Sequence, residues 1–327
     1  MRVLYIGGTG QISLPCVTES LKAGQEVAVF NRGKVDAALP AGVESIVGDM
    51  NDEAAYRALG DRSWDVVCQF MAFRPEQMAR DIEVFAGRTG QYVFISSASV
   101  YEKPARHYVI SEARTPAVNP YWQYSQLKIA CENLVKGQEK LPWTIVRPSH
   151  TVRTGLPTMI NEGDLVAERM LAGKPVIVAG DGTSPWTLTR SADFAVPFVR
   201  LFGKAAALGE IFHITADRGY GWDQIYAAIG RGLGVEPKLV HVPTDTLVRY
   251  NREWEGPLVG DKMWAALFDN SKVKAVAGAF TCSENLDEIL ADSIANFRKR
   301  QAAGIKGNSA IEPLLERIIT EQSALGG

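Results

Sequence analysis

Short apolar runs alternate with longer stretches of helical periodicity along the first half of the chain. Residues 2–6 form a β-rich apolar run that ends in glycines, and apolar positions at helix spacing follow over 14–23, with Gly24 as a stop signal. Residues 26–30 predict a second strand. A strand, a glycine turn, a helix and a strand in this order form one βαβ unit, whose crossover is almost always right-handed.

The alternation continues as far as residue 147. Further strands are predicted at 43–47, 65–70, 92–96 and 143–147, and helices fall between them at 52–59, 75–86 and 124–136. Strands that alternate with helices in this way build a parallel sheet covered on both faces. The pattern therefore predicts the α/β class, with a Rossmann-like, doubly wound parallel sheet.

The regular alternation stops after Pro148. A helix is predicted at 164–171, a loop at 180–187, a strand at 211–215, and further helices at 191–202, 221–232, 286–302 and 311–325. We expect a dinucleotide-binding domain over 1–155, with later returns near 185–215, and a smaller C-terminal α/β substrate lobe with the last helices over 156–327. The apolar stripe of the final helix is expected to pack on its own chain, and contact between two copies in a homodimer is the alternative.

Composition narrows the classes of function. The chain has 327 residues, 46% of them hydrophobic, with 35 basic and 37 acidic side chains and a net charge of -2. These values are typical of a globular protein, and collagen-like, disordered and membrane-spanning classes are excluded. No run of five basic residues is present, so nucleic acid is not an expected partner. A small-molecule substrate is expected instead.

The cysteines and the N-terminus point to a reducing compartment. The four cysteines lie far apart, without the spacing of a disulfide framework or of a metal site, and no metal is expected. The first apolar run is much shorter than the core of a signal peptide, and no stretch approaches the length of a membrane span. The expected location is cytoplasmic.

The glycine turn after the first predicted strand has the chemistry of a dinucleotide-binding loop. Gly7-Gly8-Thr9-Gly10 stands between a strand and a helix, where missing side chains let the backbone approach a pyrophosphate. Ser13, at the third position of the glycine spacing, is small enough for close packing. A tight turn that merely needs glycine is the alternative.

The end of the second strand bears on the choice between NAD and NADP. An acidic residue is expected there when the ribose hydroxyls are bound, but this chain has Asn31 and Arg32. An amide beside a guanidinium favours a 2'-phosphate and therefore NADP over NAD, although a solvated arginine is the alternative. Asp49, after the third strand, is expected near the adenine.

Tyr124 and Lys128 form a YxxxK pair whose side chains share one face of a predicted helix. Upstream, residues 94–101 place hydroxyls at the end of a strand, where ligands of parallel sheets bind. Together with the glycine loop, these segments resemble the short-chain dehydrogenase/reductase superfamily, in its extended branch, the NAD-dependent epimerase/dehydratase family. The resemblance covers most of residues 1–215.

The resemblance implies specific roles. Tyr124 would accept the proton of a substrate alcohol while hydride leaves for the nicotinamide, and Lys128 would bind the nicotinamide ribose and favour the phenolate. Ser97 would hold the same oxygen, because the family places a catalytic hydroxyl three residues before a Val-Tyr pair, here Val100-Tyr101. The residues expected to bind the cofactor are Gly7, Gly8, Thr9, Gly10, Gln11, Ile12, Asn31, Arg32, Asp49, Met50, Met71 and Lys128.

Departures from the family pattern bear on the reaction and the substrate. Dehydratases of the family carry Asp-Glu at the two positions before Val-Tyr, and decarboxylases tend to keep the Glu at the second of them. This chain has Ala98-Ser99 there, which disfavours both eliminating reactions. Epimerisation through a transient ketone and simple carbonyl reduction are left. His150 and Trp186 match positions where sugar-nucleotide epimerases place Asn and Arg against a diphosphate. The residues expected to contact the substrate are Phe73, Ser99, His150, Trp186 and Arg190.

Three functions remain open at this point. The first is an NAD(P)-dependent epimerase of a sugar or sugar-like substrate, nucleotide-linked or not. The second is an NADPH-dependent carbonyl reductase. The third is a non-catalytic dinucleotide sensor or RNA-associated scaffold, because the fold includes chloroplast stem-loop RNA-binding proteins. The third is the least favoured, since sensors commonly lack the tyrosine that this chain keeps at Tyr124, and the net charge is slightly acidic.

Overall fold

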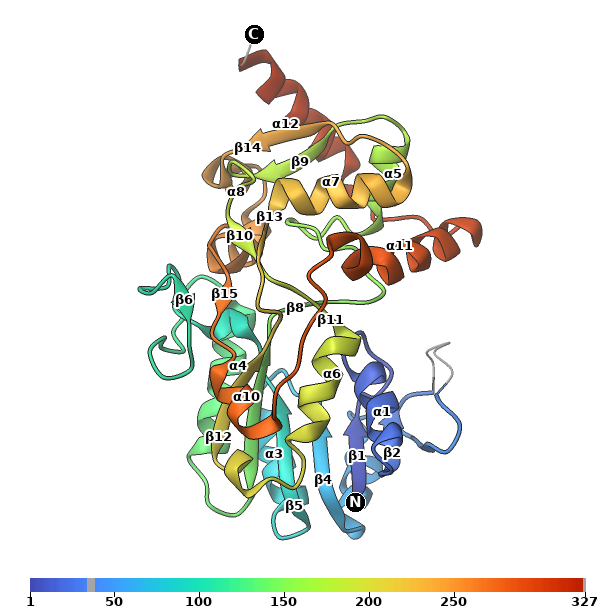
Figure 1. The fold of residues 1–327 in the computed structure, drawn as a ribbon, viewed down its shortest axis with the longest axis vertical. Coiled ribbons are helices and arrows are strands. Elements are labelled where there is room, and N and C mark those ends of the chain that lie inside the picture. Colours follow the sequence, from blue (N-terminus) through green and yellow to red (C-terminus); the bar gives the residue numbers. More distant parts are fainter. Residues whose placement is uncertain (34–38, 326–327) are drawn as a thin grey trace.

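A seven-stranded, wholly parallel sheet organises the chain in the computed structural model, which describes residues 1–33 and 39–325 (Figure 1). The strand order is β3-β2-β1-β4-β5-β7-β12. The strands are β1 (Arg2–Ile6), β2 (Glu26–Asn31), β3 (Glu44–Val47), β4 (Trp64–Gln69), β5 (Thr89–Ile95), β7 (Trp143–Pro148) and β12 (Glu210–Ile214). The chain builds the sheet outward from β1 in one direction through β2 and β3 and then in the other direction from β4 onward, as in doubly wound folds. The predicted fold class is confirmed.

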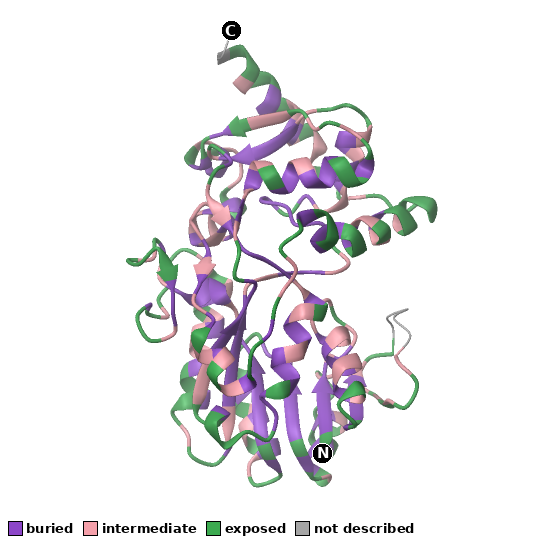
Figure 2. Cartoon of the chain, viewed as in Figure 1, coloured by how far each residue is buried: buried purple, intermediate pink, exposed green. Residues whose placement is uncertain are grey.

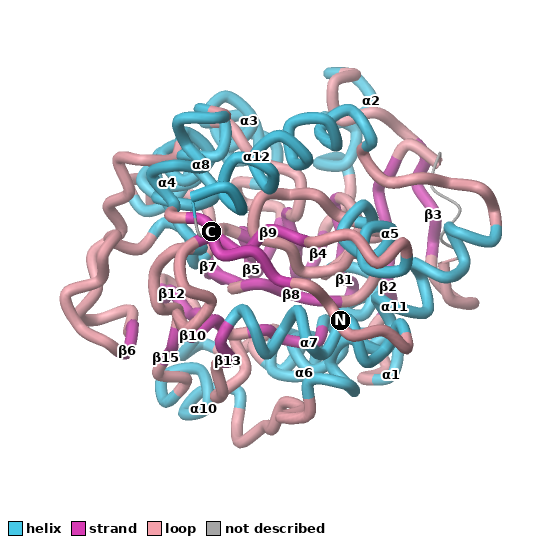
Figure 3. The backbone as a smooth tube through the Cα atoms, turned by 90° about the horizontal axis from the view of Figure 1, so that it is seen from above, coloured by secondary structure: helices cyan, strands magenta, loops and turns pink. Residues whose placement is uncertain are grey.

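Helices cover both faces of the sheet because its strands are apolar on both sides. In β1, Tyr5 packs with one buried cluster, whereas its neighbours Leu4 and Ile6 pack with another. Figure 3 shows the sheet between the two helix layers. One layer holds α1 (Ser13–Lys22), α6 (Ser191–Arg200) and α10 (Ser271–Ala277), and the other holds α2 (Glu53–Arg57), α3 (Pro75–Phe85) and α4 (Gln123–Lys136).

A second, smaller α/β part lies beyond the carboxyl ends of the strands (Figure 1) and has its own buried core (Figure 2). Its paired strands are β9 (Val176–Ala179) and β14 (Leu239–Val242). Its helices are α5 (Asp164–Leu171), α7 (Trp222–Leu233), α8 (Thr244–Tyr250), α9 (Glu255–Pro257), α11 (Leu286–Ala302) and α12 (Glu312–Leu325). Leu315 and Ile318 of α12 are buried in this core, so the final helix packs on its own chain as expected.

Short strand pairs join the two parts. They are β8 (His150–Val152) with β11 (Leu188–Arg190), β10 (Pro185–Trp186) with β13 (Tyr220–Gly221), and β6 (Val109–Ile110) with β15 (Leu267–Phe268). The predicted loop over 180–187 is therefore wrong at its end, because β10 pairs there with a segment distant in sequence. None of the helices in the described residues is both long and apolar enough to cross a membrane.

The glycine at position 8 lets the loop after β1 pack closely against β2. A Cβ built on Gly8 would lie 2.6 and 2.8 Å from the two methyl carbons of Val29 on β2. Contacts this short force movement of well-packed groups.

We therefore expect Gly8→Ala to lower the free energy of unfolding by about 1–3 kcal/mol. Urea denaturation followed by circular dichroism measures the loss. Gly155→Ala is the control, because its Cβ would meet only Gln11 Oε1, at 4.0 Å, and its effect should stay within about 0.5 kcal/mol. Equal losses in the two variants would contradict the packing argument.

Candidate active site

Two adjoining hollows lie at the carboxyl edge of the sheet. The first, the cofactor cleft, has a volume of about 480 Å³ and crosses the ends of β1, β2 and β3. Its lining includes Gly7, Thr9, Gly10, Asn31, Arg32, Asp49, Met50, Met71 and Phe73. The second, the substrate cavity, has a volume of about 330 Å³ and lies between the sheet edge and the smaller part. Its lining includes Ser97, Ser99, Tyr124, His150 and Trp186.

The glycine loop is shaped to bring backbone close to a ligand. Gly7 has a φ of +85°, and a Cβ there would lie 2.4 Å from Cγ of Met71. Ser13 closes the turn, because its hydroxyl donates to the carbonyl of Gly7 at 2.6 Å and accepts from the amide of Gly10 at 2.8 Å. The loop precedes the N-terminus of α1, where unpaired amides favour a phosphate. These residues fit the pyrophosphate of a dinucleotide.

Two residues expected to bind the cofactor have their side chains elsewhere. The amide oxygen of Gln11 accepts from the backbone amides of Thr154 and Gly155 at 3.0 and 3.2 Å, and its Nε2 donates to the carbonyl of Thr151 at 2.9 Å. The Ile12 side chain packs against the core on the α1 face of the sheet. Only the backbone of these two residues is available to a nucleotide.

Arg153 strengthens the same connection. Its guanidinium donates to the carbonyls of Gly10 and Gln11 at 2.9 and 3.0 Å. Hydrogen bonds from the side chains of Gln11 and Arg153 therefore hold residues 151–155 against the glycine loop. The shape of the cofactor loop depends on residues that follow β7.

The end of β2 offers an exposed cation. Asn31 Oδ1 accepts from the backbone amide of Gly33 at 2.7 Å, which holds the turn, and the neighbouring Arg32 side chain is exposed on the cofactor cleft. Asp49 Oδ1 likewise accepts from the amide of Asn51 at 2.9 Å. Asn31 and Asp49 thus shape their turns, whereas Arg32 is an exposed residue of the cleft lining.

Buried groups behind the cleft position Met71. The buried carboxylate of Asp81 accepts from the hydroxyls of Tyr56 and Tyr92, at 2.5 and 2.6 Å, and from Nε2 of Gln69 at 2.6 Å. The other end of the Gln69 amide accepts from the backbone amide of Met71 at 2.7 Å. The loop that packs against Gly7 is therefore tied to α3 through a chain of satisfied polar groups.

Tyr124 meets Ser97 in the substrate cavity. Burial raises the pKa of Tyr124, a hydrogen bond from the Ser97 hydroxyl opposes this shift, and the nearby carboxylate of Asp261 adds to it. The Ser97 hydroxyl also bonds to that of Ser99 at 2.9 Å, and Ser99 accepts from Ser125 of α4 at 2.8 Å. The chain of hydroxyls fixes Ser97 relative to the helix that carries Tyr124, and the Ser99 hydroxyl, expected at the substrate, is committed to that chain.

Lys128 lies one turn after Tyr124 and is almost fully buried. Its ammonium donates to the carbonyls of Ala72 and Ile95 at 2.8 and 2.9 Å, and it lies over the ring of Phe73, 4.4 Å from the ring centroid. Burial lowers the pKa of Lys128 to about 7. The ammonium thus lies between the ends of β4 and β5, where the cofactor cleft and the substrate cavity approach each other through Phe73.

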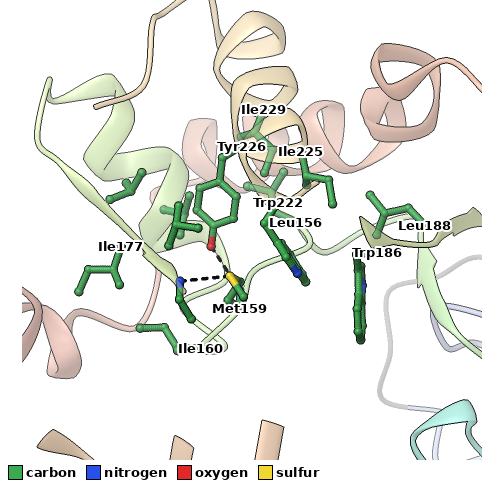
Figure 4. Close-up of a cluster of buried hydrophobic side chains, with 14 of the residues drawn as sticks. Leu156, Met159, Ile160, Ile177, Trp186, Leu188, Trp222, Ile225, Tyr226 and Ile229 are labelled. Atoms are coloured by element: carbon green, nitrogen blue, oxygen red, sulfur yellow. Dashed lines mark hydrogen bonds between the residues drawn. The ribbon is translucent and has the colours of Figure 1, made fainter. Parts of the chain in front are cut away.

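His150 and Trp186 form one wall of the substrate cavity. The indole Nε1–H of Trp186 donates to Nδ1 of His150 at 3.0 Å. Burial lowers the pKa of His150 to about 3, and the positive charge of Lys262 adds to this shift. Trp186 also contacts Trp222, with ring centroids 5.4 Å apart, and Figure 4 shows both rings in the buried cluster with Leu156. The imidazole is neutral at physiological pH.

Arg190 requires a correction. It was expected at the substrate, but its guanidinium forms ion pairs with Glu288 at 2.5 Å and with Asp193 at 4.0 Å. It is absent from the described lining of the substrate cavity. Two carboxylates on neighbouring helices draw it away from the site.

The lining residues that the sequence did not indicate include four polar or charged ones, Lys103, Asn161, Asp261 and Lys262. Lys103 forms an ion pair with Asp261 at 3.3 Å, and Lys262 donates to Oδ1 of Asn161 at 3.3 Å. Lys103 and Asn161 lie in loops and Asp261 and Lys262 lie in a single π-helical turn, all outside any motif, so no local signal marked them. Trp122, whose ring lies 4.9 Å from that of Tyr124, completes the wall.

Comparisons with known proteins agree with this geometry. The chain matches the family described as "NAD dependent epimerase/dehydratase family" over residues 3–215. It is 23% identical to 2'-dehydrokanamycin reductase of Streptomyces kanamyceticus over 336 aligned residues, covering 100% of this chain and 93% of that protein. It is 26% identical to the chloroplast stem-loop binding protein of 41 kDa b of Arabidopsis thaliana, covering 73% of this chain and 65% of that protein.

A solved structure shares the fold. The UDP-glucose 4-epimerase of Bifidobacterium longum, in complex with NAD+ and UDP, superposes with a TM-score of 0.71 at 20% identity, covering 93% of this chain and 100% of that one. The family match extends over the sheet, the glycine loop and the Tyr124 helix. The chain therefore belongs to the NAD-dependent epimerase/dehydratase family and is an oxidoreductase or epimerase of the short-chain dehydrogenase/reductase type.

Proposed function

We propose that the protein is an NAD(P)-dependent epimerase of a sugar or sugar-like substrate that acts through a transient ketone. The observation that carries the proposal is the Tyr124–Ser97 pair in a cavity of about 330 Å³, directly beside the cleft lined by the glycine loop. Phe73 connects the two, because it lines the cleft and its ring lies 6.4 Å from that of Tyr124.

The residues of the cavity supply the proton transfer. The phenolate of Tyr124 takes the proton of a substrate alcohol, and the Ser97 hydroxyl donates to the same oxygen as it becomes a carbonyl. A bound nicotinamide supplies the acceptor for the hydride. Burial alone keeps the phenol protonated, so the positive charge of the cofactor and of Lys128 must favour the phenolate. After the ketone turns in the cavity, Tyr124 returns the proton to the oxygen while the opposite face of the carbonyl takes the hydride back from the bound reduced nicotinamide, and the stereocentre is inverted.

The positions beside Ser97 support epimerisation over elimination. Ala98 and Ser99 are both buried, and the Ser99 hydroxyl is bonded to Ser97 and Ser125. The nearest described acid, Asp261, is ion-paired with Lys103. Loss of water needs a free acid and base besides the tyrosine.

An NADPH-dependent carbonyl reductase is the second candidate. The exposed Arg32 on the cofactor cleft supports NADP as the cofactor, because a guanidinium pairs well with a 2'-phosphate. The similarity to a reductase over the whole chain supports net reduction. A reductase releases its cofactor in each cycle, whereas an epimerase regenerates it in place.

Product analysis separates the two candidates. The purified protein is incubated with a panel of sugars deuterated at single carbons, and products are followed by NMR. An epimerase inverts one stereocentre, keeps the deuterium and leaves the ratio of oxidised to reduced cofactor unchanged. Consumption of NADPH in proportion to a reduced product, with no inversion, would replace the epimerase by the reductase.

Tyr124→Phe should lower kcat/KM about 10²- to 10⁴-fold, because the variant keeps the ring and loses the group that moves the proton. Steady-state kinetics measure the loss, and cofactor titration checks that binding is intact. Tyr121→Phe is the matched control, since Tyr121 is 42% exposed. Retention of full activity in Tyr124→Phe would rule out the proposed mechanism.

Arg32→Ala tests the preference for NADP. The variant should weaken NADP binding about 10- to 100-fold and leave NAD binding nearly unchanged, because only NADP carries the 2'-phosphate. Fluorescence titration gives both dissociation constants, and Arg252→Ala, another exposed arginine, serves as the control. A parallel change for both cofactors would show that Arg32 does not select NADP.

Lys128→Met tests the charge state of Lys128. The folded-state pKa is lowered to about 7 from an ordinary value of 10.5, so above neutrality the unfolded chain binds the extra proton. Stability contributed by this group is therefore lowest below about pH 7 and rises at higher pH. Relative to Lys128→Met, the free energy of unfolding of the wild type should rise by about 2 kcal/mol between about pH 7 and about pH 9. Urea titrations at both pH values measure this difference, and a constant difference would mean that the lysine keeps its ordinary pKa.

A further inference from the structure

We propose that Lys262 and His150 form a subsite for an anionic oxygen group, a carboxylate or a phosphate, carried by a compact substrate. The inference rests on the proposed function, because it describes what the same cavity binds beside Tyr124. Both residues line the substrate cavity, and they come from different segments, the start of β8 and the turn that follows α9.

Lys262 is a buried cation with incomplete partners. It is the last residue of a single π-helical turn, Leu258–Lys262, and its backbone carbonyl accepts from the indole of Trp222 at 3.2 Å, which fixes the turn against α7. The residue is only 7% exposed. Its ammonium has three donors, and its recorded partner among the described residues is the neutral amide oxygen of Asn161, at 3.3 Å. A buried charge of this kind is stabilised by an opposite charge.

His150 adds a second donor with a defined direction. An indole Nε1–H can only donate, so Nδ1 of His150, which receives it at 3.0 Å, carries no proton. The proton of the neutral ring is therefore on Nε2. The described residues offer Nε2 no recorded partner, and the half-buried ring lines the cavity. A ligand oxygen in the cavity can accept from it.

The acidic groups nearby are engaged elsewhere. The Asp261 carboxylate is ion-paired with Lys103 at 3.3 Å. Glu162 is fully enclosed, and its carboxylate accepts from the backbone amide of Ile160 at 3.0 Å. Burial raises the pKa of Glu162 to about 7, so its charge is incomplete at neutral pH. Within residues 1–33 and 39–325 Lys262 forms no salt bridge, although the charges of Asp261 and Glu162 act on its ammonium from farther away, and a ligand anion can take the place beside it.

The walls limit the size of the ligand. Trp186, Leu156 and Phe268 are buried and form part of the wall of the cavity, whose volume of about 330 Å³ is at the small end of ligand sites. One sugar ring with its own anionic group suits this space better than a nucleotide diphosphate. The ring of such a ligand can reach Tyr124, while its anionic group meets Lys262 and His150.

Calorimetric titration of the cofactor-saturated protein tests the subsite. D-glucuronate and D-glucose 6-phosphate carry the two anionic groups, D-glucose is the neutral comparison, and UDP represents a nucleotide diphosphate. We expect at least one acidic sugar to bind about tenfold more tightly than D-glucose, and Lys262→Met to remove that advantage. Lys299→Met, at an exposed helical lysine, should leave all affinities unchanged. The tighter of the two acidic sugars identifies the group.

Three results would overturn the inference. They are equal binding of neutral and acidic sugars, an unchanged preference in Lys262→Met, and tighter binding of UDP than of either acidic sugar. If Lys262→Met does not fold, as judged by its thermal midpoint and cofactor affinity, His150→Phe replaces it, with the same loss of preference expected. The binding assay is independent of turnover. Inversion of a stereocentre without any preference for anionic sugars would support the proposed function and reject the subsite. A Lys262-dependent preference for anionic sugars without inversion would support the subsite and reject the epimerase.

Discussion

The parallel alignment of the seven strands is the constraint on which the site depends. Because every strand of the sheet points the same way, all seven carboxyl ends meet at one edge, and the loops that follow them are brought together. The glycine loop follows β1, Arg32 follows β2, Met71 follows β4, Ser97 follows β5 and His150 follows β7. Reversal of one strand would move its functional loop to the opposite end of the molecule.

Polar groups buried beneath that edge give the loops their shape. Asp81 is enclosed, and burial raises its pKa, while the hydroxyls and amide that bond to it oppose the shift. The same carboxylate orients Gln69 and, through it, the backbone at Met71. On the other side of the cavity, the hydroxyls of Ser125, Ser99 and Ser97 form a comparable chain that ends at Tyr124. Groups at the surface of the cleft and the cavity are thus positioned by buried groups such as Asp81 and Ser125, which line neither of them.

Local patterns were sufficient to predict the sheet, the glycine loop and the Tyr124–Lys128 helix. In each case the signal is a periodicity or a short motif within one element, and the structure places the element accordingly. The Lys103–Asp261 pair and Lys262 could not be predicted in this way, because a loop and a short π-helical turn, which are far apart in sequence and carry no motif, bring them to the cavity. Arg190 was misplaced for the same reason. Its partner Glu288 lies 98 residues away in the sequence, and no motif near Arg190 indicates this ion pair.

The side chain of Gln11 bears on whether the nucleotide-binding part can exist alone. Its amide group bonds to residues 151–155, and β12, which completes the sheet beside β7, comes from residues 210–214. A fragment that ended at residue 149 would leave the Gln11 amide without these partners and would expose β7 as an open edge. The first half of the chain therefore has a recognisable architecture but depends on later residues for its folding. An exchange of this half between related proteins would have to include residues 150–214.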